Sequence, residues 1–360
     1  MRIAQVSPLY ESVPPKLYGG TERVVSYLTE ALVRMGHEVT LFASGDSETS
    51  GPLVPCCKEA LRLDPCCVDP LAHHILMLER VFRRADDFDI LHFHCDYLHF
   101  PFSTRQTTPA VTTLHGRLDL PDLVPLFREF DSVPVISISN AQRIPLPWLN
   151  WRRTVYHGLP ADLYNFSPRP GKYLAFLGRI SPEKGVDKAI EIAKKVDMEL
   201  WIAAKVDQAD REYFAEVIKP LLKGPSIRFL GEINDAEKNA FLGDAVALLV
   251  PINWPEPFGL VMIEAMACGT PVIAFPRGSV PEIVDEGDSG FIVDGVEGAV
   301  SAVPKAVRFD RRKCRRAFER RFNAERMARE YLETYVQLAG ESTERSCRSE
   351  ENDFWMTSSE

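Results

Sequence analysis

The sequence alternates short apolar segments with helical segments, and this alternation limits the possible folds more than any other feature. In the first half the apolar segments have the length of buried strands. The alternation predicts strands at residues 2–7, 37–43, 90–94, 110–114 and 134–139, and helices at 21–35 and 71–84. Continuous apolar strands connected by helices are typical of a parallel sheet covered on both faces. We therefore expect an α/β domain.

The second half repeats the scheme. It predicts strands at residues 173–177, 199–203, 227–230, 245–250, 272–274 and 290–293, with helices at 186–195, 211–222, 236–242 and 259–267. A length of 360 residues agrees with two domains at about 100–200 residues each. We assign residues 1–165 to an N-terminal and 166–310 to a C-terminal doubly wound, Rossmann-like domain. A ligand cleft is expected where the carboxyl ends of both sheets face each other.

The C-terminal end differs from both halves because it is strongly basic. Residues 305–329 contain eleven Lys and Arg against three Asp and Glu, with Cys314, Phe318 and Phe322 at helical spacing. We expect an amphipathic helix over 311–340 that packs back across both domains. The alternative is that 305–329 makes peripheral contact with an anionic membrane. Residues 341–360 are polar and acidic, and we predict a disordered tail.

Overall composition excludes several classes of protein. The net charge is −9 with a pI near 5.5, which argues against a nucleic-acid-binding protein. No apolar run approaches the roughly 20 residues that a transmembrane helix needs. The first residues read as a strand, without the apolar core and cleavage site of a signal peptide. We therefore expect a cytoplasmic protein.

Eight cysteines in 360 residues are too few for a disulfide scaffold. Four of them form two adjacent pairs, Cys56-Cys57 and Cys66-Cys67. Adjacent cysteines chelate one ion poorly, so we interpret them as reduced thiols in a surface loop. Their role is not evident from the sequence.

Other candidate metal ligands are equally weak. His92 and His94 share one face of a predicted strand, but no third ligand follows at a spacing that is typical of metal sites. The acidic pair in 87–89 precedes a strand instead of ending one. We predict no metal and no tightly bound cofactor.

The most informative segment follows the apolar strand at 245–250. Glu256 and Glu264 are eight positions apart around a Pro-Phe-Gly sequence that opens a helix. At about 1.5 Å per helical residue this spacing corresponds to about 12 Å, enough to reach from the sugar to the ribose of a nucleotide sugar. The free amides at the helix start, around Phe258, Gly259 and Leu260, can hold an anion.

Two further segments suit a diphosphate. Arg179 and Lys184 lie five residues apart between a strand end and a helix, and together they can neutralise phosphate groups. Gly19 and Gly20 precede the first helix, where the backbone can approach a ligand closely. His115 follows directly after the strand at 110–114, at a carboxyl strand end.

Taken together these segments resemble the family-4 glycosyltransferases, retaining enzymes with the GT-B fold. The resemblance covers residue 1 to about residue 338. It is carried by residues 18–22, 113–116, 176–179, 184–185, 256–264, 265–274 and 278–282, and the E-x7-E segment at 256–264 is its most specific part.

The resemblance implies that the C-terminal domain binds a nucleotide sugar. It assigns the diphosphate to Arg179 and Lys184, and the ribose hydroxyls to Glu264. Glu256 would contact the transferred sugar, together with the amides of the helix start, Phe258, Gly259, Leu260 and Val261. Gly19 and Gly20 would approach the diphosphate, and His115 would hydrogen-bond the sugar. Members of this family generally need no metal.

The catalytic set implied in this way is His115, Arg179, Lys184 and Glu256. Because no carboxylate is evident for a covalent sugar intermediate, we predict same-face displacement through a short-lived ion pair. UDP-glucose is the expected donor, with GDP-mannose and ADP-glucose as alternatives. Aromatic residues in N-terminal loops are candidates for acceptor binding: Tyr10, Tyr18, Tyr97, Phe100 and Phe102, beside His115.

The acceptor itself stays open among a small molecule such as a reduced pterin, a saccharide and a lipid. Two other functions compete with a small-molecule transferase, namely a membrane-surface enzyme that makes glycolipid and a non-catalytic nucleotide-sugar-binding protein. A nucleotide-dependent oxidoreductase is disfavoured because neither half contains G-x-G-x-x-G. The sequence does not indicate an oligomeric state.

Overall fold

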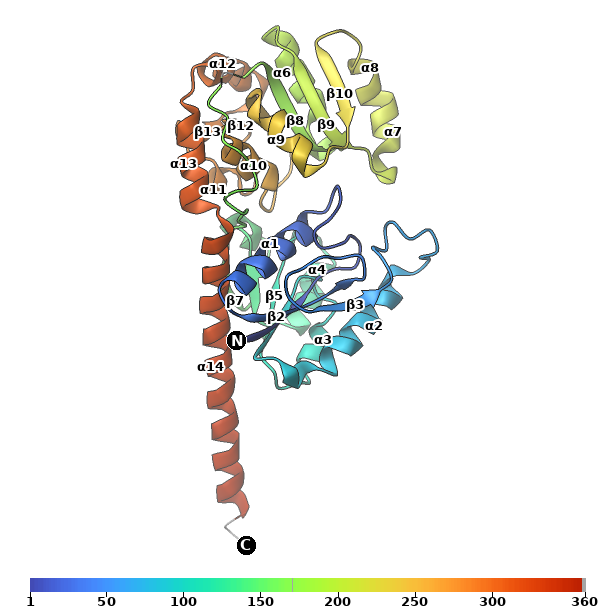
Figure 1. Cartoon of the computed structure of the whole chain (residues 1–360), viewed down its shortest axis with the longest axis vertical. Helices are drawn as coiled ribbons and strands as arrows, with labels where there is room; N and C mark the ends of the chain where they lie inside the picture. Colours follow the sequence, from blue (N-terminus) through green and yellow to red (C-terminus); the bar gives the residue numbers. More distant parts are fainter. Residues whose placement is uncertain (170, 358–360) are drawn as a thin grey trace.

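The computed structural model describes residues 1–169 and 171–357, with side chains up to residue 342. It contains two parallel sheets, one above the other in Figure 1, each with helices packed around it. The N-terminal sheet has seven strands in the order β3-β2-β1-β4-β5-β6-β7, and the C-terminal sheet has six in the order β10-β9-β8-β11-β12-β13. The predicted pair of doubly wound α/β domains is confirmed.

The N-terminal sheet is built around its first strand, which is buried after Arg2 and pairs with a neighbour on both sides. Its strands are β1 (Arg2–Val6), β2 (Glu38–Ser44), β3 (Leu53–Cys57), β4 (Ile90–Phe93), β5 (Ala110–Thr113), β6 (Val135–Ser137) and β7 (Trp151–Thr154). The helices of this half are α1 (Gly20–Arg34), α2 (Pro70–Phe82), α3 (Phe100–Ser103), α4 (Leu123–Glu129) and α5 (Asn140–Arg143), with a 3₁₀ turn at Ala85–Asp87.

The C-terminal sheet is built around β11 (Ala245–Val250), all of whose side chains are buried. The other strands are β8 (Tyr173–Arg179), β9 (Leu200–Lys205), β10 (Ile227–Gly231), β12 (Val272–Ala274) and β13 (Gly290–Ile292). Its helices are α6 (Val186–Lys195), α7 (Arg211–Tyr213), α8 (Lys219–Leu221), α9 (Asp235–Gly243), α10 (Leu260–Cys268), α11 (Val280–Ile283) and α12 (Gly295–Val307). A 3₁₀ turn at Pro182–Lys184 and another at Gln208–Asp210 precede α6 and α7, and a π-helical segment, Phe214–Ile218, joins α7 to α8.

Two strands that the pattern did not predict, β3 and β7, lie at the two edges of the N-terminal sheet. Edge strands bury less apolar surface, so their sequences carry a weaker signal. The strand β3 corrects one prediction. It contains Cys56, which is buried, and Cys57, so this pair lies in the sheet and only Cys66 and Cys67 belong to a loop. All four thiols are free.

The single helix predicted after residue 310 is in fact two helices, α13 (Arg311–Arg321) and α14 (Ala324–Thr357). The break lies at Phe322 and Asn323, where Asn323 forms a bridge with Leu159 and its side chain accepts from the Arg326 amide at 2.7 Å. The helix α13 packs on α10 of the C-terminal domain, and α14 runs along α1 and β4 of the N-terminal domain (Figure 1). The chain therefore crosses back between the domains, as expected.

The predicted disordered tail over 341–360 is also corrected, since α14 continues to Thr357. Residues 341–357 contain neither Pro nor Gly, and extending an existing helix costs far less than starting one. Residues 358–360 of that predicted tail lie outside the described residues.

The basic residues of α13 and early α14 are used largely to tie the domains together. Arg315 donates to the carbonyls of Ala161, Tyr164 and Ala267, and Arg326 donates to two carbonyls of the N-terminal domain. These contacts favour the packed arrangement over contact with a membrane. Within the described part of the chain, no helix is both long and apolar enough to span a bilayer.

Arg311 is the best-buried of these arginines, with 8% of its surface exposed. Its guanidinium donates to four acceptors at 2.6–2.8 Å, namely the carbonyls of Ser167, Gly243 and Ala245 and the hydroxyl of Thr270. We expect Arg311→Leu to lower the free energy of unfolding by about 3–5 kcal/mol, because it leaves these buried acceptors unpaired. Urea-induced unfolding measures this change. Arg312→Leu, at the exposed neighbouring position, should stay within about 0.5 kcal/mol.

Candidate active site

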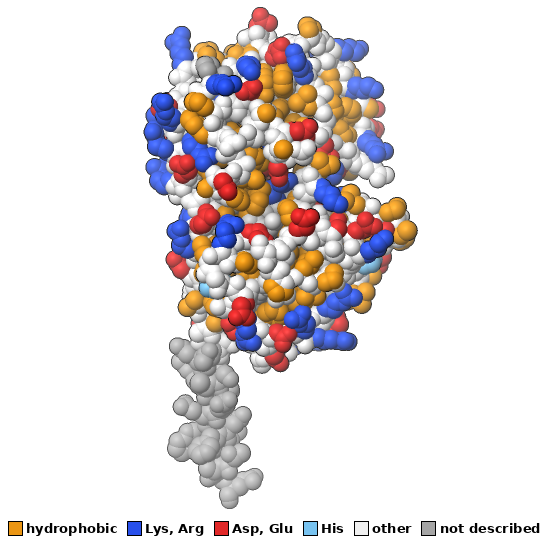
Figure 2. Space-filling model, in the orientation of Figure 1, with side chains coloured by type: hydrophobic (Ala, Val, Ile, Leu, Met, Phe, Trp, Pro, Cys, Tyr) orange, Lys and Arg blue, Asp and Glu red, His pale blue; other side chains and the backbone are white. Residues whose placement is uncertain are grey.

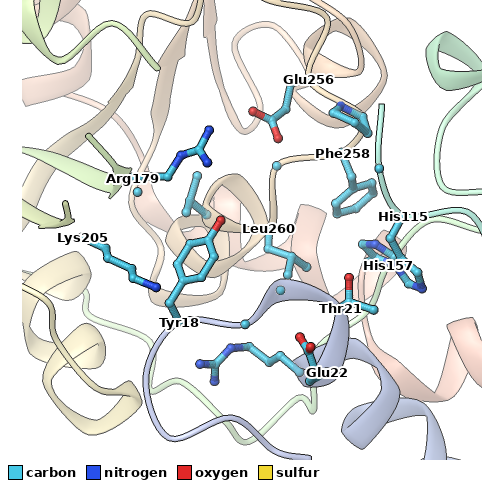
Figure 3. A pocket seen from close by; sticks show the side chains of 18 of the residues that line it. Tyr18, Thr21, Glu22, His115, His157, Arg179, Lys205, Glu256, Phe258 and Leu260 are labelled. Atoms are coloured by element: carbon cyan, nitrogen blue, oxygen red, sulfur yellow. The ribbon is translucent and has the colours of Figure 1, made fainter. Parts of the chain in front are cut away.

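A cleft of about 620 Å³ lies between the two domains, at the carboxyl ends of both sheets. Figure 3 shows its walls, with Arg179, Glu256 and Leu260 of the C-terminal domain facing Tyr18, Thr21 and Glu22 of the N-terminal domain. The volume is within the range of ligand sites that enclose most of a small molecule. Figure 2 shows acidic and basic side chains interspersed along the boundary between the domains.

The C-terminal wall is organised by the start of α10. Gly259 has φ +83° and caps this helix, and a Cβ at Gly278 would come within 2.4 Å of the Glu256 backbone, so both positions require glycine. The Phe258 carbonyl accepts from the Ser279 hydroxyl at 2.8 Å. The first amides of α10 lack intrahelical acceptors and, together with the helix dipole, favour an anion at this point.

Glu256 and Lys184 form an ion pair inside the cleft. The same carboxylate oxygen accepts from the Trp254 indole at 3.0 Å, and the Lys184 ammonium lies 4.9 Å from the Trp254 ring centroid. Both charged side chains are mostly buried, at 23% and 12% exposure for Lys184 and Glu256. The lysine is therefore held in place before any ligand arrives.

Arg179 ends β8 and is surrounded by acidic groups. It donates to Glu183 at 2.6 Å, and its other nitrogens lie 3.7 Å from Asp207 and 3.6 Å from Asp210. The Nε atom has no hydrogen-bond partner among the described residues. A guanidinium that lines the cleft and is oriented by carboxylates is suited to bind a phosphate.

Glu264 lies within α10 and is only 2% exposed, although it lines the cleft. One of its oxygens accepts from Lys238 at 3.0 Å and from the Tyr164 hydroxyl at 3.4 Å. No hydrogen bond of the described residues occupies its second oxygen, Oε2. The Glu264 carboxylate can therefore receive donors from a ligand.

The N-terminal wall approaches the C-terminal wall through the two glycines that precede α1. Gly19 has φ +152°, and a Cβ there would lie 2.8 Å from Pro15. A Cβ at Gly20 would contact the Leu260 side chain at 3.6 Å, so the loop lies against the start of α10. All residues predicted to bind the donor line this one cleft: Gly19, Gly20, Arg179, Lys184, Phe258, Gly259, Leu260, Val261 and Glu264.

His115 follows β5 and also lines the cleft. Its ring stacks on His157 at 5.3 Å, and His157 in turn contacts Phe258 edge-on, as Figure 3 shows from the side of the cleft. Gln142 fixes the backbone on either side of His115, because its side chain donates to the carbonyls of Leu114 and Gly116 at 2.8 Å. Burial lowers the pKa of His115 to about 3, so its imidazole is neutral at physiological pH.

The aromatic residues predicted to bind the acceptor divide into two groups. Tyr10, Tyr18 and Tyr97 line the cleft. Phe100 does not, because it is fully buried against Phe127 in the core, and its prediction as an acceptor residue was wrong. Phe102 stacks on Phe82 outside the cleft. The sequence pattern does not show which aromatic side chains point into the cleft, so it could not distinguish these two phenylalanines from the tyrosines.

Several cleft residues were not predicted from the sequence. Arg23 of α1 forms an ion pair with Asp235 of α9 and donates to the Leu17 carbonyl at 2.7 Å, which ties the two walls together. Lys238 of α9 forms an ion pair with Glu264 of α10. These pairs form only in the folded chain, and no local pattern would have indicated them.

Two acidic residues of the N-terminal wall were also missed. Asp96 follows β4 with φ +49°, an uncommon conformation for a non-glycine residue that is often found at functional sites. Burial raises the pKa of Asp96 to about 6 and that of Glu22 to about 7. Asp96 follows a strand, and Glu22 lies in the first turn of a helix. These positions are the sequence signal that could have indicated both residues.

The fold and the cleft define the class of the protein. Two Rossmann-like domains, with the cations Arg179 and Lys184 and the start of α10 lining the cleft between them, have the architecture of a GT-B glycosyltransferase that uses a nucleotide sugar. Comparison with known families agrees: the model of "Glycosyltransferase Family 4" matches residues 18–177, and that of "Glycosyl transferases group 1" matches residues 165–315. The chain belongs to the family-4 GT-B glycosyltransferases.

Individual relatives are similar over most of their length. A phosphatidyl-myo-inositol mannosyltransferase of Mycolicibacterium smegmatis is 27% identical, covering 84% of both chains. Among solved structures, AviGT4 of avilamycin A biosynthesis has a TM-score of 0.75 at 23% identity, covering 94% of this chain and 98% of its own. HepE of Anabaena in complex with UDP and glucose has a TM-score of 0.73 at 20% identity, covering 94% and 100%.

Proposed function

We propose that this enzyme transfers glucose from UDP-glucose to a hydroxyl group of an acceptor, with retention of configuration and without a metal ion. The observation that carries the proposal is the arrangement of charge around the start of α10. Two cations, Arg179 and Lys184, and two carboxylates, Glu256 and Glu264, line one wall of a single cleft. The two cations suit the diphosphate of a nucleotide sugar, and the two carboxylates suit the hydroxyl groups of its sugar and its ribose.

The cations and the helix start would hold the diphosphate. Negative charge develops on this group as the glycosidic bond breaks, and preorganised donors that match developing charge are usually the largest catalytic contribution. The Arg179 and Lys184 side chains are already oriented by carboxylates, so little reorganisation is needed when the phosphate binds. This is the basis for predicting that the reaction needs no metal.

Retention follows in this proposal from displacement on one face of the sugar. Glu256 is engaged by Lys184 and Trp254, which suits binding of sugar hydroxyls and not attack on the anomeric carbon. The acceptor hydroxyl would attack from the side on which the diphosphate leaves, through a short-lived ion pair. The trapping of a glycosyl adduct on an Asp or Glu side chain would argue for a covalent intermediate instead.

The acceptor would bind to the N-terminal wall. Tyr10, Tyr97 and Asp96 line this end of the cleft together with Arg62, which pairs with Glu11 at 2.6 Å. Rings, a carboxylate and a guanidinium can bind a polar molecule with an apolar face. The choice of glucose and uridine is consistent with HepE, whose structure was solved with UDP and glucose.

A panel of nucleotides and nucleotide sugars tests the donor. We expect UDP and UDP-glucose to raise the thermal unfolding temperature, since a ligand at 100 times its Kd stabilises a protein by about 2.7 kcal/mol. GDP, ADP and their mannose and glucose derivatives should produce little change. The shift with UDP-glucose should be the same with EDTA as with Mg²⁺. A response to GDP or ADP alone would reassign the donor, and a loss of the shift in EDTA would contradict metal independence.

A lipid acceptor is the second candidate, and a specific surface favours it. Five apolar side chains around the start of α2 are more than 40% exposed, namely Leu63, Val68, Leu71, Ile75 and Leu76. Figure 2 shows hydrophobic side chains on the loop that leads into this helix. The buried face of α2 carries His74, which lines the cleft and contacts the Tyr10 ring at 4.9 Å. Sedimentation with liposomes separates this candidate from a small-molecule transferase.

A further inference from the structure

A continuous chain of hydrogen bonds runs from His115 in the cleft through the N-terminal domain to the C-terminal helix α14. Its six bonds measure 2.6–3.1 Å. In order, the chain passes through His115, His94, Gln5, Tyr335, His92, Thr113 and Tyr331. All members except His115 are 0–1% exposed, so water does not compete for these bonds.

Gln5 sets the direction of the chain because its amide has one donor end and one acceptor end. Its Nε2 donates to the Tyr335 hydroxyl at 3.1 Å, so its Oε1 accepts from His94 Nε2 at 2.8 Å. His94 is neutral, since burial lowers its pKa well below the ordinary value, and its Nδ1 is therefore an acceptor. The ring of His115 must then donate through Nε2, at 2.8 Å.

The remaining bonds have the same direction. The Tyr335 hydroxyl accepts from Gln5 and donates to His92 Nδ1 at 2.6 Å. His92 Nε2 donates to the Thr113 hydroxyl at 2.7 Å, which donates to Tyr331 at 3.0 Å. Every group therefore both accepts and donates without conflict, from the cleft to the far end of the chain.

We propose that Tyr335 is a positioning residue that, through this chain, holds His115 as the Nε2–H tautomer. The Nδ1 lone pair of His115 is then left for the ligand, and it accepts a hydrogen bond from a hydroxyl group of the transferred sugar. The inference rests on the proposed function for the identity of that sugar, but not for the tautomer. It also gives α14 a role in the reaction, because this helix supplies the hydroxyl on which Gln5 is oriented.

The tautomer can be measured in the ligand-free enzyme. In full-length protein labelled with ¹⁵N-histidine, the ring-nitrogen spectrum distinguishes Nε2–H from Nδ1–H imidazole, and the His115 signals are identified by their loss in His115→Gln. We expect the wild type to show only the Nε2–H form. Tyr335→Phe should show a mixture of both forms, and turnover of UDP-glucose should fall on the order of 10-fold, as is typical when a group that orients an active-site ligand is removed.

The matched control is Tyr331→Phe. It removes the same atom from the same helix at an equally buried position, but at the far end of the chain. We expect it to retain the wild-type His115 spectrum and turnover within twofold. Should Tyr335→Phe fail to fold, Gln5→Met interrupts the chain one step closer to His115 and should produce the same mixture.

Two results would overturn the inference: an Nδ1–H His115 in the wild type, or an unchanged His115 spectrum in folded Tyr335→Phe or, where that variant does not fold, in Gln5→Met. Failure of the proposed function gives a different result. In that case no nucleotide sugar would bind in the donor panel, while the tautomer in the ligand-free protein would still be Nε2–H.

Discussion

Replacing Lys184 with Met is expected to lower kcat by about 100- to 1,000-fold. Lys184 lines the cleft together with Arg179 and the start of α10, where the leaving diphosphate would gain charge in the proposed reaction. Loss of one preorganised group at such a position typically has an effect of this size. Because the interaction strengthens as charge develops, the change should appear mainly in kcat and only weakly in KM. Release of UDP from UDP-glucose, by transfer or by slow hydrolysis, measures it.

The matched control is Lys188→Met, four residues further along the chain in the first turn of α6. This lysine lies over the Phe275 ring at 5.7 Å, outside the residues that line the cleft, and its loss should change kcat less than twofold. An equal effect of both variants, or a kcat for Lys184→Met within threefold of the wild type, would contradict the assigned role.

The partner of Lys184 gives an additional test. Because Glu256 forms an ion pair with this lysine, the two residues should not act independently. Glu256→Gln in the Lys184→Met background should lower kcat by a smaller factor than in the wild type. Strictly additive effects would show that the ion pair does not orient the lysine during the reaction.

That the residues proposed to bind the donor share one cleft could be predicted, because they are close together in the sequence. Glu256, the amides of the helix start and Glu264 lie within nine residues, and Arg179 and Lys184 within six. A strand end, a loop and a helix place such neighbours on one wall whatever the rest of the fold does. Their shared place in the cleft was therefore recoverable from local pattern alone.

The N-terminal half of the site depends on contacts that no local pattern contains. Arg23 and Asp235 are 212 positions apart, and Gln5 and Tyr335 are 330 positions apart. The first pair exists because α1 and α9 face each other across the two domains, and the second because α14 crosses back over the N-terminal domain. The error at Phe100 has a related cause, since an aromatic residue after a strand can point either into the cleft or into the core.

The helices and strands show the same difference between what local sequence determines and what tertiary contacts determine. Strands with buried side chains on both faces, such as β11, were predicted to the residue, whereas the edge strands β3 and β7 were missed. The break between α13 and α14 was missed because no Gly or Pro marks it. Here Asn323 bridges to Leu159, and this tertiary contact interrupts a sequence that otherwise favours one helix.

The second large effect is expected for Glu264→Gln, which should raise the Kd of UDP by about 100-fold. The carboxylate has one oxygen engaged by Lys238 and Tyr164, so the other would accept from the two ribose hydroxyls in the proposed complex. Hydrogen bonds to a charged group contribute about 1.5 kcal/mol or more each, and about 1.4 kcal/mol corresponds to a tenfold change in Kd. Isothermal titration calorimetry measures the change, and Glu191→Gln on the exposed face of α6 should leave the Kd unaltered.

A modified ligand shows whether this effect acts through the ribose. 2′,3′-Dideoxy-UDP lacks both hydroxyls, so it should bind wild type and Glu264→Gln with nearly equal affinity, while UDP distinguishes them about 100-fold. If Glu264→Gln instead weakened both ligands equally, the carboxylate would act by neutralising Lys238 and shaping the cleft. The interaction energy from this cycle thus separates recognition of the ribose from a purely structural ion pair in a buried position.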